Sequence, residues 1–211
     1  MQICIECYYC LLMSGLRERK KQRTREQIIE SAFELFRERG YVGTTIADIA
    51  AAAEISPRTF FAYFPSKEAL VFHNFDAILE SVQASILDRP DGKSTIDTLR
   101  GWVGAELSPD QRIRDQEAMR VRMCREDASL AAFQQHNQAK FTDVLRQGVA
   151  RDLGESPDSL HPKLVSASIM AALVAIGEEN PSRPRALALF DEALVFLRGG
   201  VAALSAARAA N

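Results

Sequence analysis

The stretch TTIADIAAAAEISPRTFFAYFPSKEAL, Thr44–Leu70, decides how the first part of this chain folds. Thr45 precedes Asp48 by three residues, which is the spacing of a helix N-cap with a carboxylate that reaches back to it. The apolar residues of the next two turns recur at helical spacing and give this helix one buried face: Ile46, Ile49, Ala50 and Ala53. The stretch therefore predicts a short amphipathic helix that begins directly after Thr45.

A second short helix follows in the same stretch. Ser56 is a good N-cap, and Pro57 is tolerated in a first helical turn because its missing N–H is not needed there. Pro65 disfavours helical geometry at the residue before it, so this helix is expected to be about two turns long. Ser66 then predicts the capped start of a third helix. Two short helices joined by a tight turn indicate a helix-turn-helix, which places its second helix in the DNA major groove.

The segment in front of this motif predicts a longer helix, residues 24–39, which Gly40 ends as the C′ residue directly after it. Its apolar stripe is formed by Ile28, Ile29, Ala32, Phe33 and Phe36. A run rich in basic residues leads into it, and such an arm neutralises phosphates: Arg17, Arg19, Lys20, Lys21, Arg23 and Arg25.

These features together resemble the TetR family of bacterial transcriptional regulators over residues 23–70. The specific elements are the Gly40-Tyr41 break, Thr44-Thr45, Asp48-Ile49-Ala50, Ser56, Thr59-Phe60-Phe61, Tyr63-Phe64 and Lys67-Glu68. The resemblance implies a ligand-released repressor that binds double-stranded DNA at a palindromic operator as a homodimer. It also implies a small-molecule effector, whose identity the sequence does not give.

The resemblance carries DNA-binding roles onto particular residues. Contacts with base edges or the adjacent backbone are implied for Ser56, Pro57, Arg58 and Thr59. Contacts with phosphates are implied for Thr45, Tyr63 and Lys67. Arginine to guanine is the commonest specific base contact, and Arg58 is the cation of the second short helix. Phe61 stands where the family often has a phosphate-binding tyrosine, and Glu54 stands where glycine is frequent, which adds strain or repulsion at the turn. The expected DNA-binding set is therefore Arg17, Arg19, Lys20, Lys21 and Arg23 of the arm, with Thr45, Ser56, Pro57, Arg58, Thr59, Phe61, Tyr63 and Lys67.

Length and charge agree with a soluble regulator without requiring one. The chain has 211 residues and a net charge of −2, and its charge is distributed with only modest contrast: residues 14–75 carry 10 Lys/Arg and 8 Asp/Glu, and residues 76–211 carry 16 and 19. The apolar N-terminal stretch is interrupted by Glu6 and is too short to span a bilayer, so no membrane segment and a cytoplasmic, nucleoid-associated protein are expected. Residues 1–13 share no pattern with the rest of the chain and are interpreted as a disordered or dispensable extension. Residues 14–65 are then the DNA-binding domain and 66–211 a helical domain.

The rest of the chain reads as helices, so the expected fold class is all-α. Their expected ranges are 66–88, 94–107, 109–126, 128–153, 157–178 and 183–207. Breakers separate them at Pro90-Asp91-Gly92, Ser108-Pro109, Gly154–Pro157 and Asn180–Pro184. Because the helix 66–88 would join both domains, its tilt is the expected lever between effector and DNA.

The last two helices are predicted to form the dimer interface. One stripe of the final helix contains Leu187, Phe190, Leu194, Leu197 and Val201, and another contains Leu189, Ala193 and Phe196. A helix that is apolar on two faces can pack on its own core and on a partner. The segment LVSASIMAALVAI, 164–176, adds small residues that let helices approach closely.

An effector pocket is expected between the middle helices, because methionines and aromatics with a few polar groups suit an adaptable apolar site. The candidate residues are Trp102, Met119, Met123, Phe133, His136, Asn137, Phe141 and Met170, with Arg120 and Arg122 nearby. The same residues also suit an ordinary core.

Three other readings stay open. Cys4, Cys7 and Cys10 have a spacing that suits a metal or redox sensor, although no metal or cofactor is expected, and Cys124 is expected to be buried packing. A helical interaction module with a vestigial motif is another possibility. An enzyme is not expected, and no catalytic residues are proposed, because the three histidines are scattered and no catalytic motif accompanies them.

Overall fold

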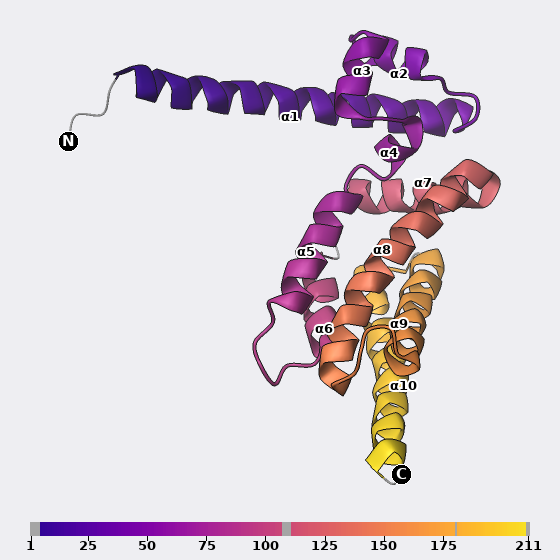
Figure 1. Ribbon diagram of the computed structural model, residues 1–211. Coiled ribbons are helices and arrows are strands. Elements are labelled where there is room, and N and C mark those ends of the chain that lie inside the picture. The colour runs from indigo at the N-terminus through magenta and orange to yellow at the C-terminus, as the bar shows by residue number, and fades with distance from the viewer. Residues whose placement is uncertain (1–4, 107–110, 180, 210–211) are drawn as a thin grey trace. The chain divides into compact units, whose positions relative to one another are not determined.

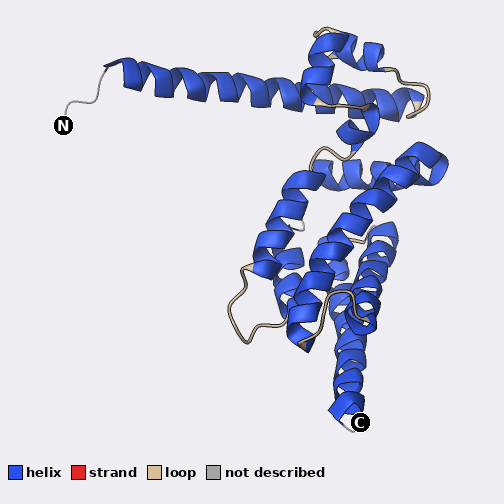
Figure 2. Cartoon of the chain, in the orientation of Figure 1, coloured by secondary structure: helices blue, strands red, loops and turns tan. Residues whose placement is uncertain are grey.

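The computed structural model describes residues 5–106, 111–179 and 181–209, and the regular structure within these ranges is all helical (Figures 1 and 2). The expected all-α class is therefore confirmed. The chain divides into two compact units, Met1–His73 and Asn74–Asn211. The division falls after His73 rather than after Pro65, because the short helix that follows Ser66 packs with the first unit.

The first unit is built on α1 (Ile5–Arg39), which is followed by α2 (Ile46–Ala52), α3 (Pro57–Tyr63) and α4 (Lys67–Val71). Its core combines the predicted stripe of α1 with apolar residues of the short helices: Ile28, Ala32, Phe33, Phe36, Ile49, Ala50, Phe60, Phe64 and Leu70. Burial of such side chains is the main stabilising contribution to a small domain. Figure 1 shows α2, α3 and α4 gathered at the C-terminal half of α1, whose leading half extends beyond them.

The first helix is longer than the sequence pattern predicts. It begins at Ile5 rather than near Thr24, so residues 5–13 continue α1. Residues 1–4 lie outside the described part of the chain, as do the side chains of residues 5–16, which include Cys7 and Cys10. That the extension is dispensable stays a prediction.

The predicted single helix 66–88 is wrong. The chain instead forms α4 and then α5 (Phe75–Leu87), with a break at residues 72–74. Arg25 of α1 donates a hydrogen bond of 2.5 Å from Nη2 to the carbonyl of His73, and the backbone N–H of His73 donates to Leu70 instead of continuing the α-helical pattern. The expected lever, one continuous helix 66–88 whose tilt couples the two units, is therefore not present.

The second unit contains α5, α6 (Thr95–Glu106), α7 (Gln111–Glu126), α8 (Ala128–Leu153), α9 (Leu160–Glu179) and α10 (Arg183–Ala209). These bounds agree with the remaining predicted helices to within a few residues. Gly154 ends α8 with a φ of +62°, a left-handed conformation that glycine adopts without strain. The predicted breakers Ser108-Pro109 and Asn180 lie outside the described residues.

The core of the second unit lies where α5, α6, α8, α9 and α10 meet. Its buried members include Val82, Ile86, Leu99, Leu145, Ile169, Phe190 and Leu194. At one end of this core, the guanidinium of Arg89 is enclosed. It donates to the carbonyls of Ile86, Lys93 and Gly148 and pairs with Asp152, which also accepts from the backbone N–H of Thr95. This arginine thus fixes the loop between α5 and α6 against α8.

Candidate nucleic-acid interface

The first helix of the predicted motif is capped as the sequence indicates. The backbone N–H of Asp48 donates to Thr45 Oγ1 over 3.1 Å, and the backbone N–H of Thr45 donates to Asp48 Oδ2 over 2.8 Å. The hydroxyl of Thr45 also donates to the same carboxylate. These bonds lower the pKa of Asp48, with the side-chain bond from Thr45 as the largest cause. Thr45 therefore has a structural role, whatever it contributes toward DNA.

The turn between the two short helices is strained at Glu54. Its φ is +55°, the left-handed region that L residues other than glycine, asparagine and aspartate rarely adopt. The backbone N–H of Ile55 donates to the carbonyl of Ala50 across this turn over 2.9 Å, which holds the conformation. The strain expected from glutamate at this position is thus confirmed.

The second short helix, α3, presents its N-terminal end to solvent. Ser56 caps it, because its Oγ accepts from the backbone N–H of Thr59 over 3.0 Å and lies 2.8 Å from the Thr59 hydroxyl. The side chains of Ser56, Pro57 and Arg58 are exposed. A capped, exposed helix end with one arginine is the arrangement that can enter a major groove and read bases.

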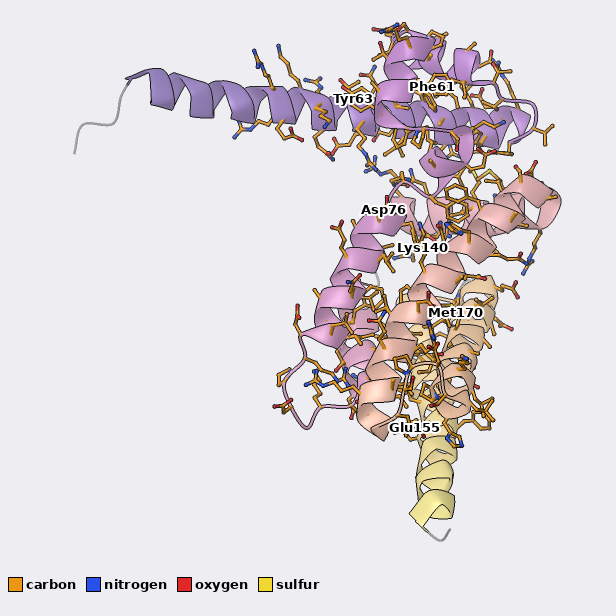
Figure 3. The ribbon with its side chains drawn as sticks, viewed as in Figure 1. Phe61, Tyr63, Asp76, Lys140, Glu155 and Met170 are labelled. Atoms are coloured by element: carbon orange, nitrogen blue, oxygen red, sulfur yellow. The ribbon has the colours of Figure 1, made fainter. Side chains whose placement is uncertain are left out.

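The aromatic residues of α3 divide between core and surface. Phe60 and Phe64 are buried, as predicted, and their ring centroids lie 5.8 Å apart. Phe61 is 54% exposed, and its ring meets that of Phe60 edge-on. Tyr63 is half-buried; Figure 3 labels it with Phe61 on α3. Phe61 thus exposes an apolar ring without a hydroxyl.

Lys67, predicted to hold phosphate, is engaged within the protein. Its Nζ donates to the carbonyls of Tyr41 and Thr44, each over 2.8 Å, and lies 3.9 Å from the centroid of the Tyr41 ring. The Tyr41 hydroxyl in turn donates to Glu68 over 2.9 Å. Lys67 and Glu68 therefore tie the α1–α2 loop to the start of α4. A phosphate contact by Lys67 stays a prediction, and this second role was not foreseen.

The basic arm is separated by the structure into two groups. Five of its side chains are exposed on the leading half of α1: Arg17, Arg19, Lys20, Lys21 and Arg23. Arg25 is different, because it donates to the His73 carbonyl and lies 5.2 Å from the centroid of the Phe64 ring. Sequence reasoning could not separate Arg25 from the run, since its partners lie about forty residues or more along the chain.

The candidate effector residues of the second unit fall into three groups. Met119, Met123, Asn137 and Phe141 are buried. Trp102 and Met170 are partly buried against the core, and Trp102 lies 5.8 Å from Phe141 between ring centroids. Phe133 is half-buried, whereas His136 and Arg122 are exposed; Arg120 is paired with Glu117. Figure 3 labels Met170 on α9.

The cysteine and metal readings gain no support from the residues that the structure describes. Cys124 is buried, as predicted, and burial raises the pKa of its thiol. Among the described residues, no group of three His, Cys, Asp or Glu is close enough to hold a metal ion. Cys4 lies outside the described residues, and nothing is described of the Cys7 and Cys10 side chains.

Helices α9 and α10 expose apolar side chains. Leu160 and Leu164 on α9 are exposed, and Val195 and Phe196 on α10 are 72% and 78% exposed. Phe190, Leu194 and Leu197, from the first predicted stripe of α10, instead form part of the core of their own unit. By length and composition α9 would also suit a membrane span, which is weak information from one helix because helices of soluble proteins pass the same test.

Comparison with known proteins covers both units. The family described as "Bacterial regulatory proteins, tetR family" matches residues 28–73, and the family described as "MftR C-terminal domain" matches residues 94–202, more than half of the chain. The HTH-type transcriptional regulator TcmR of Streptomyces glaucescens is 33% identical over 175 residues, which are 78% of this chain and 76% of TcmR.

Two further matches extend the comparison. The regulator MftR of Mycobacterium tuberculosis is 28% identical over 161 residues, 76% of this chain and 81% of MftR. Among solved structures, the SmeT–triclosan complex matches with a TM-score of 0.63 at 23% identity, over 84% of this chain and 91% of SmeT. At that identity the structural match supports the fold alone.

Proposed function

The chain belongs to the TetR family of bacterial transcriptional regulators, and we propose that it is a homodimeric repressor that a small molecule releases from a palindromic operator. The observation that carries the proposal is the exposed, serine-capped start of α3 with Arg58 beside it. We infer that Arg58 reads a guanine and that Ser56, Pro57 and Thr59 lie at adjacent bases or backbone.

Phosphate contacts would position the protein without reading sequence. The five exposed cations on the leading half of α1 suit this role, because each phosphate that they neutralise releases condensed counterions. Thr45, Tyr63 and Lys67 are the other candidates, although Thr45 and Lys67 also have partners inside the protein. Phe61 would contribute apolar contact instead of a hydrogen bond.

We infer that the dimer forms through α9 and α10. Exposed apolar side chains on both helices favour burial against a second copy, and α9 adds a row of exposed small residues at helical spacing: Ala167, Ala171 and Ala175. Two helices from each copy would then pack as a four-helix interface. A membrane location for α9 is the less favoured alternative, because the family relatives are transcriptional regulators and a cytoplasmic protein is consistent with them.

The effector is inferred to bind in the second unit among the candidate residues around α7 and α8. A solved protein of the same fold, SmeT, forms a complex with triclosan. A ligand can shift an equilibrium only by its difference in affinity for the two states, so the effector must favour a dimer in which the recognition helices do not match successive major grooves.

The test is selection of duplexes from a random pool by the purified full chain at two salt concentrations. An enriched palindrome that survives the higher salt would support the proposal. Arg58→Ala should then relax preference at one base pair of each half-site and cost about 1–3 kcal/mol of binding free energy. Arg37→Ala, which removes a charge from an exposed position of α1 outside the expected DNA-binding set, is the control. If a folded dimer enriches no sequence, the proposal fails.

A further inference from the structure

Asn137, in the middle of α8, carries a buried hydrogen-bond donor that no described residue satisfies. The residue is 5% exposed, and within the described part of the chain its Nδ2 has no acceptor. Native proteins retain few such groups, because a buried N–H loses its bond to water and gains nothing in return. An acceptor from outside the chain would explain why this position is an asparagine.

One other buried side-chain atom in the described residues lacks a partner, the hydroxyl oxygen of Thr95, and its surroundings differ. It lies where α8 approaches closely at Gly148: a Cβ placed on that glycine would be 2.8 Å from Thr95 Oγ1 and 2.5 Å from Ile86. That crossing has no room for a ligand. Asn137 is therefore the better candidate for a binding role.

The side chains along the same face of α8 are apolar and aromatic. Phe133 and Phe141 lie one helical turn before and after Asn137. The ring of Phe141 meets that of Trp102, whose indole N–H already donates to Ser81 Oγ over 2.9 Å. The indole donor is thus satisfied within the protein, whereas the amide donor is not.

The neighbouring helix supplies side chains that can adapt. α7 packs against α8 and contributes the buried Met119 and Met123. Methionine is unbranched and flexible, so its side chain can rearrange around an entering molecule. Met119 and Met123 are therefore the candidates on α7 for the apolar part of a site in which Asn137 would be the polar group.

The cations of the second unit limit which ligand group could accept a hydrogen bond from Asn137. The buried cation of the second unit that the structure describes is Arg89, and it is already paired with Asp152. On α7, the half-buried Arg120 is paired with Glu117. The neighbours His136 and Lys140 on α8 are exposed. A carboxylate buried beside Asn137 would therefore lack a buried counter-ion, which is costly. A neutral carbonyl oxygen has no such cost.

We propose that Asn137 Nδ2 donates a hydrogen bond to a carbonyl oxygen of the effector, and that the effector is an uncharged, largely aromatic molecule carrying that carbonyl. This inference rests on the proposed effector-responsive function of the second unit, and it adds the chemical class of the molecule and the residue that orients it.

The test uses benzophenone and diphenylmethane, which share a two-ring skeleton and differ in the carbonyl. Binding to the full-length protein is measured by isothermal titration and by the shift in Tm. The wild type should bind benzophenone about tenfold more tightly than diphenylmethane. Asn137→Leu, which keeps a similar volume, should bind both equally. Gln135→Leu, which removes an exposed amide from the same helix, should retain the wild-type preference.

A second measurement, the Tm without probe, distinguishes a loss of binding from misfolding of the variant. Without any probe, Asn137→Leu should melt at or above the Tm of the wild type, because it removes an unsatisfied donor. A lower Tm would show that the amide has a partner inside the protein and would overturn the proposal. No binding of benzophenone, or an equal preference in Asn137→Leu and the wild type, would also overturn it.

Failure of this inference can be distinguished from failure of the proposed function. Operator binding by the wild type and Asn137→Leu is measured without probe and should be the same. A wild type that binds its operator but does not distinguish the two probes would refute only the role of Asn137. A wild type that selects no operator would refute the proposed function.

Discussion

The two units satisfy their polar groups in different ways. In the first unit, the helix caps are formed by residues three positions apart, such as Thr45 with Asp48 and Ser56 with Thr59. In the second unit, the buried Arg89 guanidinium bonds to Gly148 and Asp152 about sixty residues away, and Asn137 Nδ2 has no acceptor among the described residues. The caps of the helix-turn-helix therefore depend on residues close in sequence, whereas the buried arginine of the second unit depends on contacts distant in sequence.

The largest expected effect is at Arg89. Arg89→Met should lower the free energy of unfolding of the second unit by about 3–5 kcal/mol, because it leaves Asp152 and three carbonyls without their buried donor. The single tryptophan, Trp102, lies in this unit, so its fluorescence during urea denaturation reports the change.

The control for Arg89 is another arginine of the same region. Arg151 pairs with Asp91, whose side chain is 99% exposed, so Arg151→Met should cost less than about 1 kcal/mol. Equal effects of the two substitutions would contradict the idea that the buried, long-range contacts hold this unit together.

The next effect is at Lys67, one of the few long-range polar contacts of the first unit. Lys67→Met should lower the stability of this unit by about 2 kcal/mol, since the carbonyls of Tyr41 and Thr44 lose a charged donor. Hydrogen exchange of α2 amides would detect the loss. Lys21→Met, at an exposed position of α1, should leave exchange unchanged. Unaltered α2 exchange in Lys67→Met would show that the tie contributes little.

A smaller and opposite effect is expected at the strained turn. Glu54→Gly should stabilise the first unit by about 0.5–1 kcal/mol. Glycine adopts the φ of +55° without the steric cost that glutamate has there, and this gain exceeds the extra chain entropy that glycine loses on folding. Glu54→Ala removes the same carboxylate but keeps the backbone cost, so it should not stabilise. Thermal denaturation followed by circular dichroism compares the three proteins, and stabilisation by alanine alone would point to charge rather than strain.

The smallest expected effect is the loss of stability at acid pH. The pKa of Asp48 is lowered in the folded protein by its bonds to Thr45, so the ionised carboxylate stabilises the fold. That contribution is complete above the unfolded pKa of about 3.9 and is lost as the pH falls through the lowered native value. The stability difference between wild type and Asp48→Asn should therefore shrink as the pH drops from 6 to 3. A difference independent of pH would contradict this linkage.

Much of the fold could be predicted because its signals are local. The caps at Thr45, Ser56 and Ser66 and the left-handed glycine at Gly154 depend on residues within one turn, and each is present in the structure. The break between α4 and α5 could not be predicted, because Arg25, which binds the His73 carbonyl, lies 48 residues away. Periodicity alone favoured a continuous helix there.

The candidate site was predictable to the same extent. The exposed start of α3 with Arg58 follows from the order of caps and aromatics, and so does the burial of Phe60 and Phe64. The second role of Lys67 and the separation of Arg25 from the basic arm did not follow, because both depend on which distant carbonyls the folded chain brings within reach.

The sequence by itself determined the all-helical class, the helix-turn-helix and the order of the helices, because caps, breakers and apolar periodicity act over a few residues. Only the tertiary structure decided which charged groups are structural, where the long connecting helix breaks, and that Asn137 is buried without an acceptor. Those outcomes depend on which groups lose contact with water when distant segments pack, and no local pattern records that.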